Sequence, residues 1–201
     1  KINTGAVFRI ISEGIPDARA QGVSLDAGIQ YTSGDYRQLR FGIALRNIGP
    51  AMRYSGDGLA TRARLLPTEY ELTMEQRSAY FELPSLLSMS ASYDIALDSS
   101  SRNHIITLAG TFVANAFEND QFIAGIQYSM ADWLQLRAAY NYQSGLWDDE
   151  TRNTVFTGPS AGASVQFPFG EERNKNLGFD YSFRASNPFS GTHTFGAHLT
   201  F

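Results

Sequence analysis

The segment Thr192-His-Thr-Phe-Gly-Ala-His-Leu-Thr-Phe201 decides the fold class, because apolar and polar side chains alternate along it to its last residue. Phe195, Ala197 and Leu199 fall on one face of an extended chain, and the residues between them fall on the other. Alternation with a period of two residues places the apolar side chains on one side of the strand and the polar side chains on the other. The segment therefore predicts a β-strand with two different faces.

The same segment carries a second pattern, polar-x-Gly-x-x-apolar-x-aromatic, formed by Thr194, Gly196, Leu199 and Phe201. The pattern resembles the terminal signal that outer-membrane β-barrel proteins present to their insertion machinery. We therefore expect a multi-pass β-barrel in a bacterial outer membrane.

The composition agrees with this expectation. The 201 residues, 43% of them apolar, are enough for one domain, and we expect residues 1–201 to form a single barrel domain. No stretch approaches the ~20 uncharged apolar residues that a spanning helix needs. The mean hydropathy of -0.24 still suits a barrel, because half of each spanning strand is polar.

Charge and residue content argue against several function classes. The chain has no cysteine, and its net charge of -4 gives no reason to expect a nucleic-acid partner. The three histidines, His104, His193 and His198, lie beside no Gly-x-Ser-x-Gly elbow and no paired-carboxylate motif. We expect a protein that is not an enzyme and has no cofactor or metal site. A lipid hydrolase remains an alternative that would need a serine and a histidine within hydrogen-bond reach.

Alternation recurs along the whole chain and predicts ten strands. Most have about nine to eleven residues, the length that a tilted strand needs to cross the hydrocarbon layer. The fold class expected is all-β, a transmembrane antiparallel up-and-down β-barrel. The predicted strands are 5–12, 22–32, 39–47, 83–97, 104–113, 122–130, 134–142, 160–167, 177–184 and 192–201.

A periplasmic carboxy terminus sorts the connections onto two sides. The longest connections then fall outside the cell, which is the usual asymmetry of a barrel. The periplasmic set is 33–38, 98–103, 131–133 and 168–176, and the extracellular set is 13–21, 48–82, 114–121, 143–158 and 185–191.

The long extracellular loop 48–82 is the main candidate for binding, because a loop of this length is uncommon unless it has a function. It contacts a partner or closes the pore, or it is a plain surface lid with a short hairpin over 71–81. The acidic run 148–150 is a solvated turn or bridges lipopolysaccharide through a divalent cation. The candidate partner-contact residues of these loops are Pro50, Tyr54, Tyr70, Tyr80 and Trp147.

Charged residues on the predicted inward faces form a mixed-sign set. They pair with one another in the lumen or line a path for solutes. The set comprises Arg9, Asp26, Arg40, Arg46, Asp94, Arg137, Asp180 and Arg184.

Short stretches distributed over nearly all of the chain carry a family resemblance. They are Arg46-Asn-Ile-Gly-Pro50, Phe81-Glu-Leu-Pro-Ser-Leu-Leu87, Ser90-Ala-Ser-Tyr-Asp94, Ala109-Gly-Thr-Phe112, Asn119-Asp-Gln-Phe122, Ser160-Ala-Gly-Ala163, Phe179-Asp-Tyr-Ser-Phe-Arg184 and Asn187-Pro-Phe-Ser-Gly-Thr-His193. Together they resemble the PorV/PorQ family of the type IX secretion system, within the FadL-like barrel superfamily. The Phe-Glu-Leu-Pro-Ser stretch and the closing hairpin are the most specific of these matches.

The resemblance implies a barrel of about fourteen strands, of which this chain would supply the carboxy-terminal ten. The alternative is that the ten strands close alone. The implied activity is binding: the family receives cargo proteins with a C-terminal signal domain at a large outer-membrane translocon barrel of the SprA/Sov type and carries them to the sortase attachment complex. The lipid membrane and lipopolysaccharide are further expected partners. The alternative function is a FadL-like channel for hydrophobic small molecules.

Overall fold

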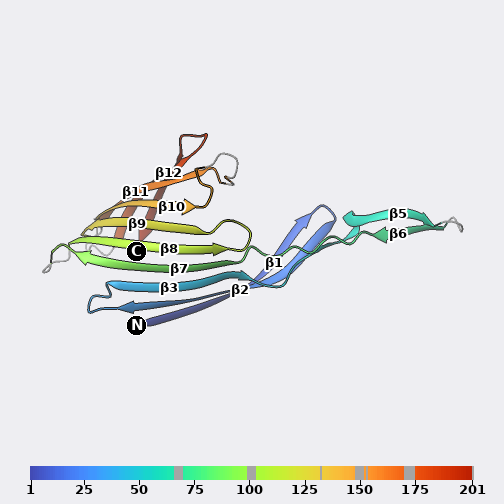
Figure 1. The fold of residues 1–201 in the computed structure, drawn as a ribbon, viewed down its shortest axis with the longest axis horizontal. Helices are drawn as coiled ribbons and strands as arrows, with labels where there is room; N and C mark the ends of the chain where they lie inside the picture. The colour runs from blue at the N-terminus through green and yellow to red at the C-terminus, as the bar shows by residue number, and fades with distance from the viewer. Residues whose placement is uncertain are drawn as a thin grey trace. The chain divides into compact units, whose positions relative to one another are not determined.

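The computed structural model describes residues 1–65, 70–98, 103–131, 133–147, 152, 154–169 and 175–200, and within these ranges the regular structure is almost entirely β. Ten strands lie in one antiparallel up-and-down sheet in sequence order (Figure 1). They are β1 (Ile2–Ile15), β2 (Ala18–Ser33), β3 (Leu39–Ile48), β7 (Leu86–Ala96), β8 (His104–Asn115), β9 (Gln121–Met130), β10 (Leu134–Gln143), β11 (Phe156–Phe169), β12 (Lys175–Ser186) and β13 (Thr192–Thr200).

These ten strands confirm the predicted all-β, up-and-down architecture. Each predicted segment overlaps one observed strand, because alternation specifies both the strand and its faces. The order of strands begins at β1 and ends at β13, so the described residues form an open sheet and not a closed barrel.

The connection expected at 13–21 is wrong. β1 and β2 continue further than predicted and meet in a two-residue turn of Pro16 and Asp17. Pro16 presets the entry to the turn, and Asp17 takes a left-handed φ of 61°, which Asp tolerates better than most residues. The predicted strand 5–12 was therefore too short.

The segment 48–82 is not a plain loop. It contains β4 (Tyr54–Ser55), which pairs with β2, and the 3-10 turn η1 (Asp57–Leu59). It also contains a hairpin of β5 (Ala60–Leu65) and β6 (Tyr70–Glu75), which lies earlier in the chain than the hairpin expected over 71–81.

The described chain divides into two compact units. The first comprises residues 1–3, 29–43 and 88–201, and the second comprises 4–28 and 44–87. The expectation of a single domain remains a prediction.

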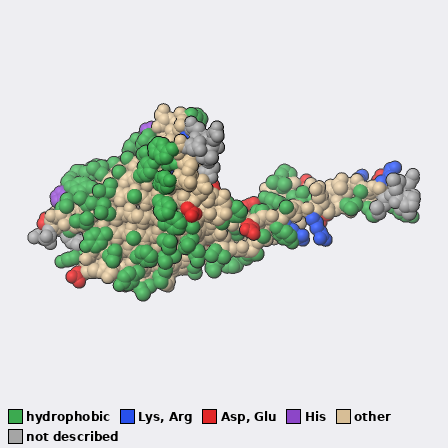
Figure 2. All heavy atoms as spheres, in the orientation of Figure 1, with side chains coloured by type: hydrophobic (Ala, Val, Ile, Leu, Met, Phe, Trp, Pro, Cys, Tyr) green, Lys and Arg blue, Asp and Glu red, His purple; other side chains and the backbone are tan. Residues whose placement is uncertain are grey.

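The strand register in the first unit produces one apolar and one polar face. Leu108, Ile126 and Ala138 are opposite one another across β8, β9 and β10, and Leu108 and Ile126 are about half exposed. Figure 2 shows hydrophobic side chains spread over the surface of these strands. The apolar face of this sheet is therefore largely uncovered.

The core of the second unit is small. Ala18, Ala20 and Met52 are buried, and Met52 lies over Gly22, where an added Cβ would come within 2.3 Å of its sulfur. Gly49 approaches the backbone of β2 so closely that a Cβ there would lie 2.1 Å from the Val23 carbonyl oxygen. Glycine at these two positions allows residues 49–52 to pack on β2.

Candidate functional site

Pairs of rings lie at both ends of the exposed apolar face. At the start of β8, His104 Nδ1 lies 2.7 Å from the Tyr128 hydroxyl oxygen. At the start of β13, His193 Nδ1 lies 2.9 Å from the Tyr181 hydroxyl oxygen. Because antiparallel neighbours alternate in direction, these two strand starts belong to opposite ends of the sheet. Amphipathic rings at both borders of an apolar band are typical of a membrane-facing surface.

The apolar face also carries a hollow of about 530 Å³. Its floor consists of small residues, Ala91, Gly110 and Ala124, which lie on the neighbouring strands β7, β8 and β9. Phe112 and Phe122 form part of its wall, with their ring centroids 4.7 Å apart. The hollow therefore opens on the apolar face and not on the polar one.

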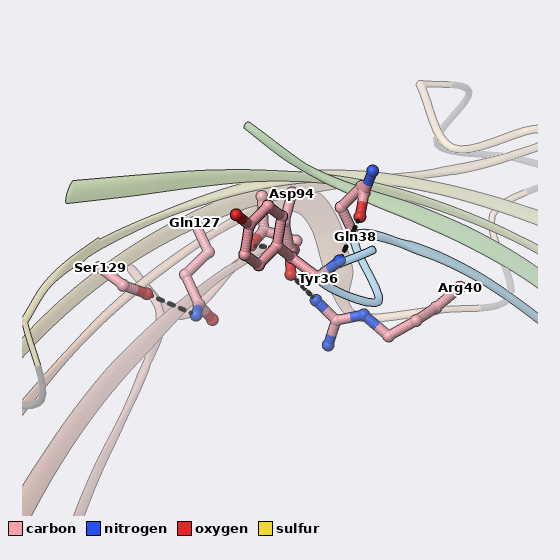
Figure 3. A network of polar contacts seen from close by, with 7 residues as sticks. Tyr36, Gln38, Arg40, Asp94, Gln127 and Ser129 are labelled. Atoms are coloured by element: carbon pink, nitrogen blue, oxygen red, sulfur yellow. Dashed lines mark hydrogen bonds and ion pairs between the residues drawn. The ribbon is translucent and has the colours of Figure 1, made fainter. Parts of the chain in front are cut away.

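The polar face contains a network between β3, β7 and β8. The Arg40 guanidinium forms an ion pair with Asp94, and Thr107 donates to Asp94 Oδ1 at 2.7 Å. Figure 3 shows Arg40 and Asp94 directed toward each other across β3 and β7, with Tyr36 and Gln127 close by. The Asp94 side chain is 13% exposed and the Arg40 side chain is 40% exposed, so this ion pair is only partly shielded from water.

Further along the polar face, Arg137 donates through Nε to Gln127 Oε1 at 2.9 Å, and Gln127 donates to Ser129 at 3.0 Å. In the second unit, Arg9 pairs with Asp26 at 2.6 Å. The prediction that inward charges pair with one another is confirmed for Arg9–Asp26 and Arg40–Asp94. Among the remaining predicted charges, Arg184 lies over the ring of Phe156, with 3.5 Å from Cζ to the ring centroid.

A serine, an aspartate and a histidine meet on the polar face of β11, β12 and β13. Ser164 donates to Asp180 Oδ1 at 2.5 Å, and His198 Nδ1 lies 3.0 Å from Asp180 Oδ2. The aspartate therefore lies between the serine and the histidine. A hydrolase triad needs the histidine between the other two, so that the ring can take the serine proton. This geometry does not supply that base, and the expectation of a nonenzymatic protein remains a prediction.

Two of the predicted contact residues, Tyr54 and Tyr80, make separate side-chain contacts in the second unit. Tyr54 donates its hydroxyl to Glu13 at 3.0 Å and stacks on Phe81 with 5.4 Å between ring centroids. This hydrogen bond raises the pKa of the Tyr54 phenol above its ordinary value, and burial and the Glu13 charge act in the same direction. Tyr80 is exposed and lies beside Arg53, whose Cζ is 5.5 Å from the ring centroid.

The other predicted contact residues lie elsewhere. Pro50 is exposed just after β3, and Tyr70, which is 70% exposed, begins β6. Trp147 is also exposed but belongs to the first unit. A role of these five residues in partner contact remains a prediction.

The residues of the expected insertion signal divide between the two faces of β13. Leu199 lies opposite Leu177 on the apolar face, while Thr194 lies opposite Ser182 and Gly196 opposite Asp180 on the polar face. Phe201 and the acidic run 148–150 lie outside the described residues. A role in insertion remains a prediction.

Sequence reasoning missed an arginine cleft in the second unit. Arg19, Gln21, Arg53 and Tyr80 line a cleft of about 380 Å³. The amino-acid sequence contains only a weak indication of this cleft, because β4 has only two residues and its register on β2 could not be predicted from alternation.

Within the described ranges, no group of three or more His, Asp or Glu side chains is placed to hold a metal ion. In the same part of the chain, no helix is long and apolar enough to span a bilayer. No family model, no curated protein and no solved structure matches this chain.

Proposed function

We propose that this chain is an outer-membrane β-barrel component of a type IX secretion system, of the PorV/PorQ family and FadL-like in architecture. It binds cargo proteins that carry a C-terminal signal domain at a large translocon barrel of the SprA/Sov type, and it passes them to the sortase attachment complex. The proposal combines the distributed resemblance of the sequence with the two faces of the sheet.

The observation that carries the membrane location is the exposed apolar face with ring pairs at both ends. Four apolar side chains from β8, β9, β10 and β12 are almost half exposed: Leu108, Ile126, Leu136 and Phe179. In water this arrangement leaves a large apolar surface uncovered, which is unfavourable and rare in a soluble monomer. Hydrocarbon removes that cost, and the rings of His104 with Tyr128 and of His193 with Tyr181 then lie toward the two polar borders.

The observation that supports binding is the hairpin of β5 and β6. One of its faces carries Tyr70, Leu72 and Met74, which are 70%, 46% and 51% exposed, and the opposite face carries the pair of Arg64 with Glu71. A two-stranded ribbon is marginally stable in water when its apolar face is uncovered. The stripe Tyr70–Leu72–Met74 is therefore suited to contact with a partner protein.

The polar face favours binding over conduction of hydrophobic solutes. A channel of the FadL-like kind needs an apolar path, whereas the Arg40–Asp94 pair and the Arg137–Gln127 hydrogen bond occupy this face with polar groups. Polar groups of this kind do not provide the apolar surface that a hydrophobic solute needs. The channel is therefore the alternative function, and the experiment described next distinguishes it from the secretion role.

The test is capture of the tagged, full-length protein from native outer membranes, followed by mass spectrometry of proteins and bound lipids. We expect recovery of a very large translocon barrel and of cargo with C-terminal signal domains. Leu72→Ser should reduce that recovery, and Phe117→Ser, which removes another exposed apolar side chain outside the hairpin, should not. Recovery of a bound fatty acid without translocon or cargo would overturn the proposal in favour of the channel.

A further inference from the structure

Strand alternation places two arginines on one face of the second unit. Arg19 lies opposite Ser55, and Ala20 lies opposite Tyr54. Since side chains alternate along a strand, Arg19 and Gln21 share a face with Arg53 and Ser55, while Ala20 and Tyr54 point to the other side. The four residues of the first face line the cleft of about 380 Å³, together with Tyr80.

The two guanidinium groups of this cleft lack a carboxylate partner within the part of the chain that the structure describes. The Glu13 carboxylate accepts the hydroxyl of Tyr54, which belongs to the opposite face. Arg19 and Arg53 are diagonal neighbours across β2 and β4, a relation that places their Cα atoms about 7–8 Å apart. Both side chains are exposed, and an anion between them would be attracted by both guanidinium charges.

The neutral groups of the cleft favour an anion as well. Gln21 and Ser55 offer an amide and a hydroxyl donor, and the Tyr80 ring lies against Arg53. Two guanidinium charges match a phosphate monoester, which carries about -1.5 to -2 near neutral pH, better than they match a single carboxylate. Arginine also binds phosphate oxygens through two parallel N–H donors.

We propose that the cleft lined by Arg19, Gln21, Arg53, Ser55 and Tyr80 binds a phosphate monoester. The phosphate belongs to a lipid headgroup or to a soluble phosphorylated compound. The proposal does not depend on a role in secretion, because it rests on the charges and register of this unit alone.

The test uses the full-length protein in detergent micelles and inorganic phosphate as the probe, with line broadening in ³¹P NMR as the readout. Arg19→Gln and Arg53→Gln should each weaken binding by at least about tenfold, and the double variant should abolish it. Arg62→Gln is the matched control, because it removes the same charge from an exposed position outside the cleft. Circular dichroism establishes that each variant keeps its β structure. If Arg53→Gln does not fold, Arg53→Lys is used in its place, because it keeps the positive charge.

Two results would overturn the phosphate site: equal line broadening by the double variant and the wild type, or displacement of phosphate by an equal concentration of acetate. A short-chain phosphatidic acid added to the micelles identifies the source. Displacement of phosphate by this lipid, dependent on Arg19 and Arg53, supports a headgroup ligand. Retention of phosphate supports a soluble ligand.

Discussion

Leu108→Arg tests the central physical claim, that the exposed apolar face of β8 to β10 contacts hydrocarbon. Leu108 lies midway along β8, opposite Ile126, and is 46% exposed. Its neighbour Ala109 is also exposed, but it lies opposite Gly125 on the polar face. Leu108→Arg and Ala109→Arg therefore place the same charge at almost the same height on opposite sides of one strand.

The expected loss of stability differs between a surface that faces a bilayer and one that faces water. An arginine on the lipid face near the bilayer midplane costs about 2–4 kcal/mol, whereas an exposed substitution in water usually changes stability by less than about 0.5 kcal/mol. The bilayer cost corresponds to a fall of roughly 30- to 700-fold in the ratio of folded to unfolded protein. Ala109→Arg should stay near the wild-type value, since its side chain reaches a polar surface.

The assay is reversible urea unfolding of the full-length protein from lipid vesicles, with the mobility of the unheated protein in gel electrophoresis as a measure of folding. Leu108→Arg should lower the free energy of unfolding by about 2–4 kcal/mol relative to Ala109→Arg. Equal stability of the two variants would refute a hydrocarbon-facing role for this surface.

Three further predictions concern glycine packing, pH and the polar face. Gly49→Ala should destabilise the protein by about 1–3 kcal/mol, because its Cβ would meet the Val23 carbonyl oxygen, while Gly110→Ala, whose Cβ meets nothing within 4 Å, should be close to neutral in the same urea titration. The raised pKa of Tyr54 means that its stabilising contribution is present below pH about 10 and is lost as pH rises through the folded-state pKa; the ultraviolet titration curve should extend to higher pH in the wild type than in Glu13→Gln, which returns the pKa of Tyr54 toward the ordinary value, and identical curves would contradict this assignment. Asp94→Leu should cost about 1–3 kcal/mol by leaving Arg40 unpaired, and the double variant Asp94→Leu with Arg40→Met should recover part of that loss; no recovery would mean that the ion pair is not what the single variant disrupts.

Alternation predicted most of the sheet because one face of each strand differs chemically from the other. β9 is a clear case, since Phe122, Ala124 and Ile126 lie on one face and Gln121 and Gln127 on the other. The extent of β1 was less predictable, because Glu13 lies between Ile11 and Ile15 on one face of the strand and interrupts its apolar pattern.

The hairpin of β5 and β6 shows the same limit. β6 alternates regularly, with Tyr70, Leu72 and Met74 between polar residues, and its signal could have been recognised. Its partner reads Ala-Thr-Arg-Ala-Arg-Leu, where short and charged side chains obscure the period. The arginine cleft was beyond prediction for a different reason: it depends on which residue of β4 pairs with Arg19, and two residues carry too little pattern to specify a register.

The hairpin of β5 and β6 also has a kinetic consequence. Its two strands pair only with each other among the described strands, so its order depends on one ladder and on whatever covers Tyr70, Leu72 and Met74. A partner that binds there must supply part of the free energy that orders the ribbon, which reduces affinity without reducing the area of contact. In the proposed function, a weaker affinity of this kind would favour rapid release of the bound partner.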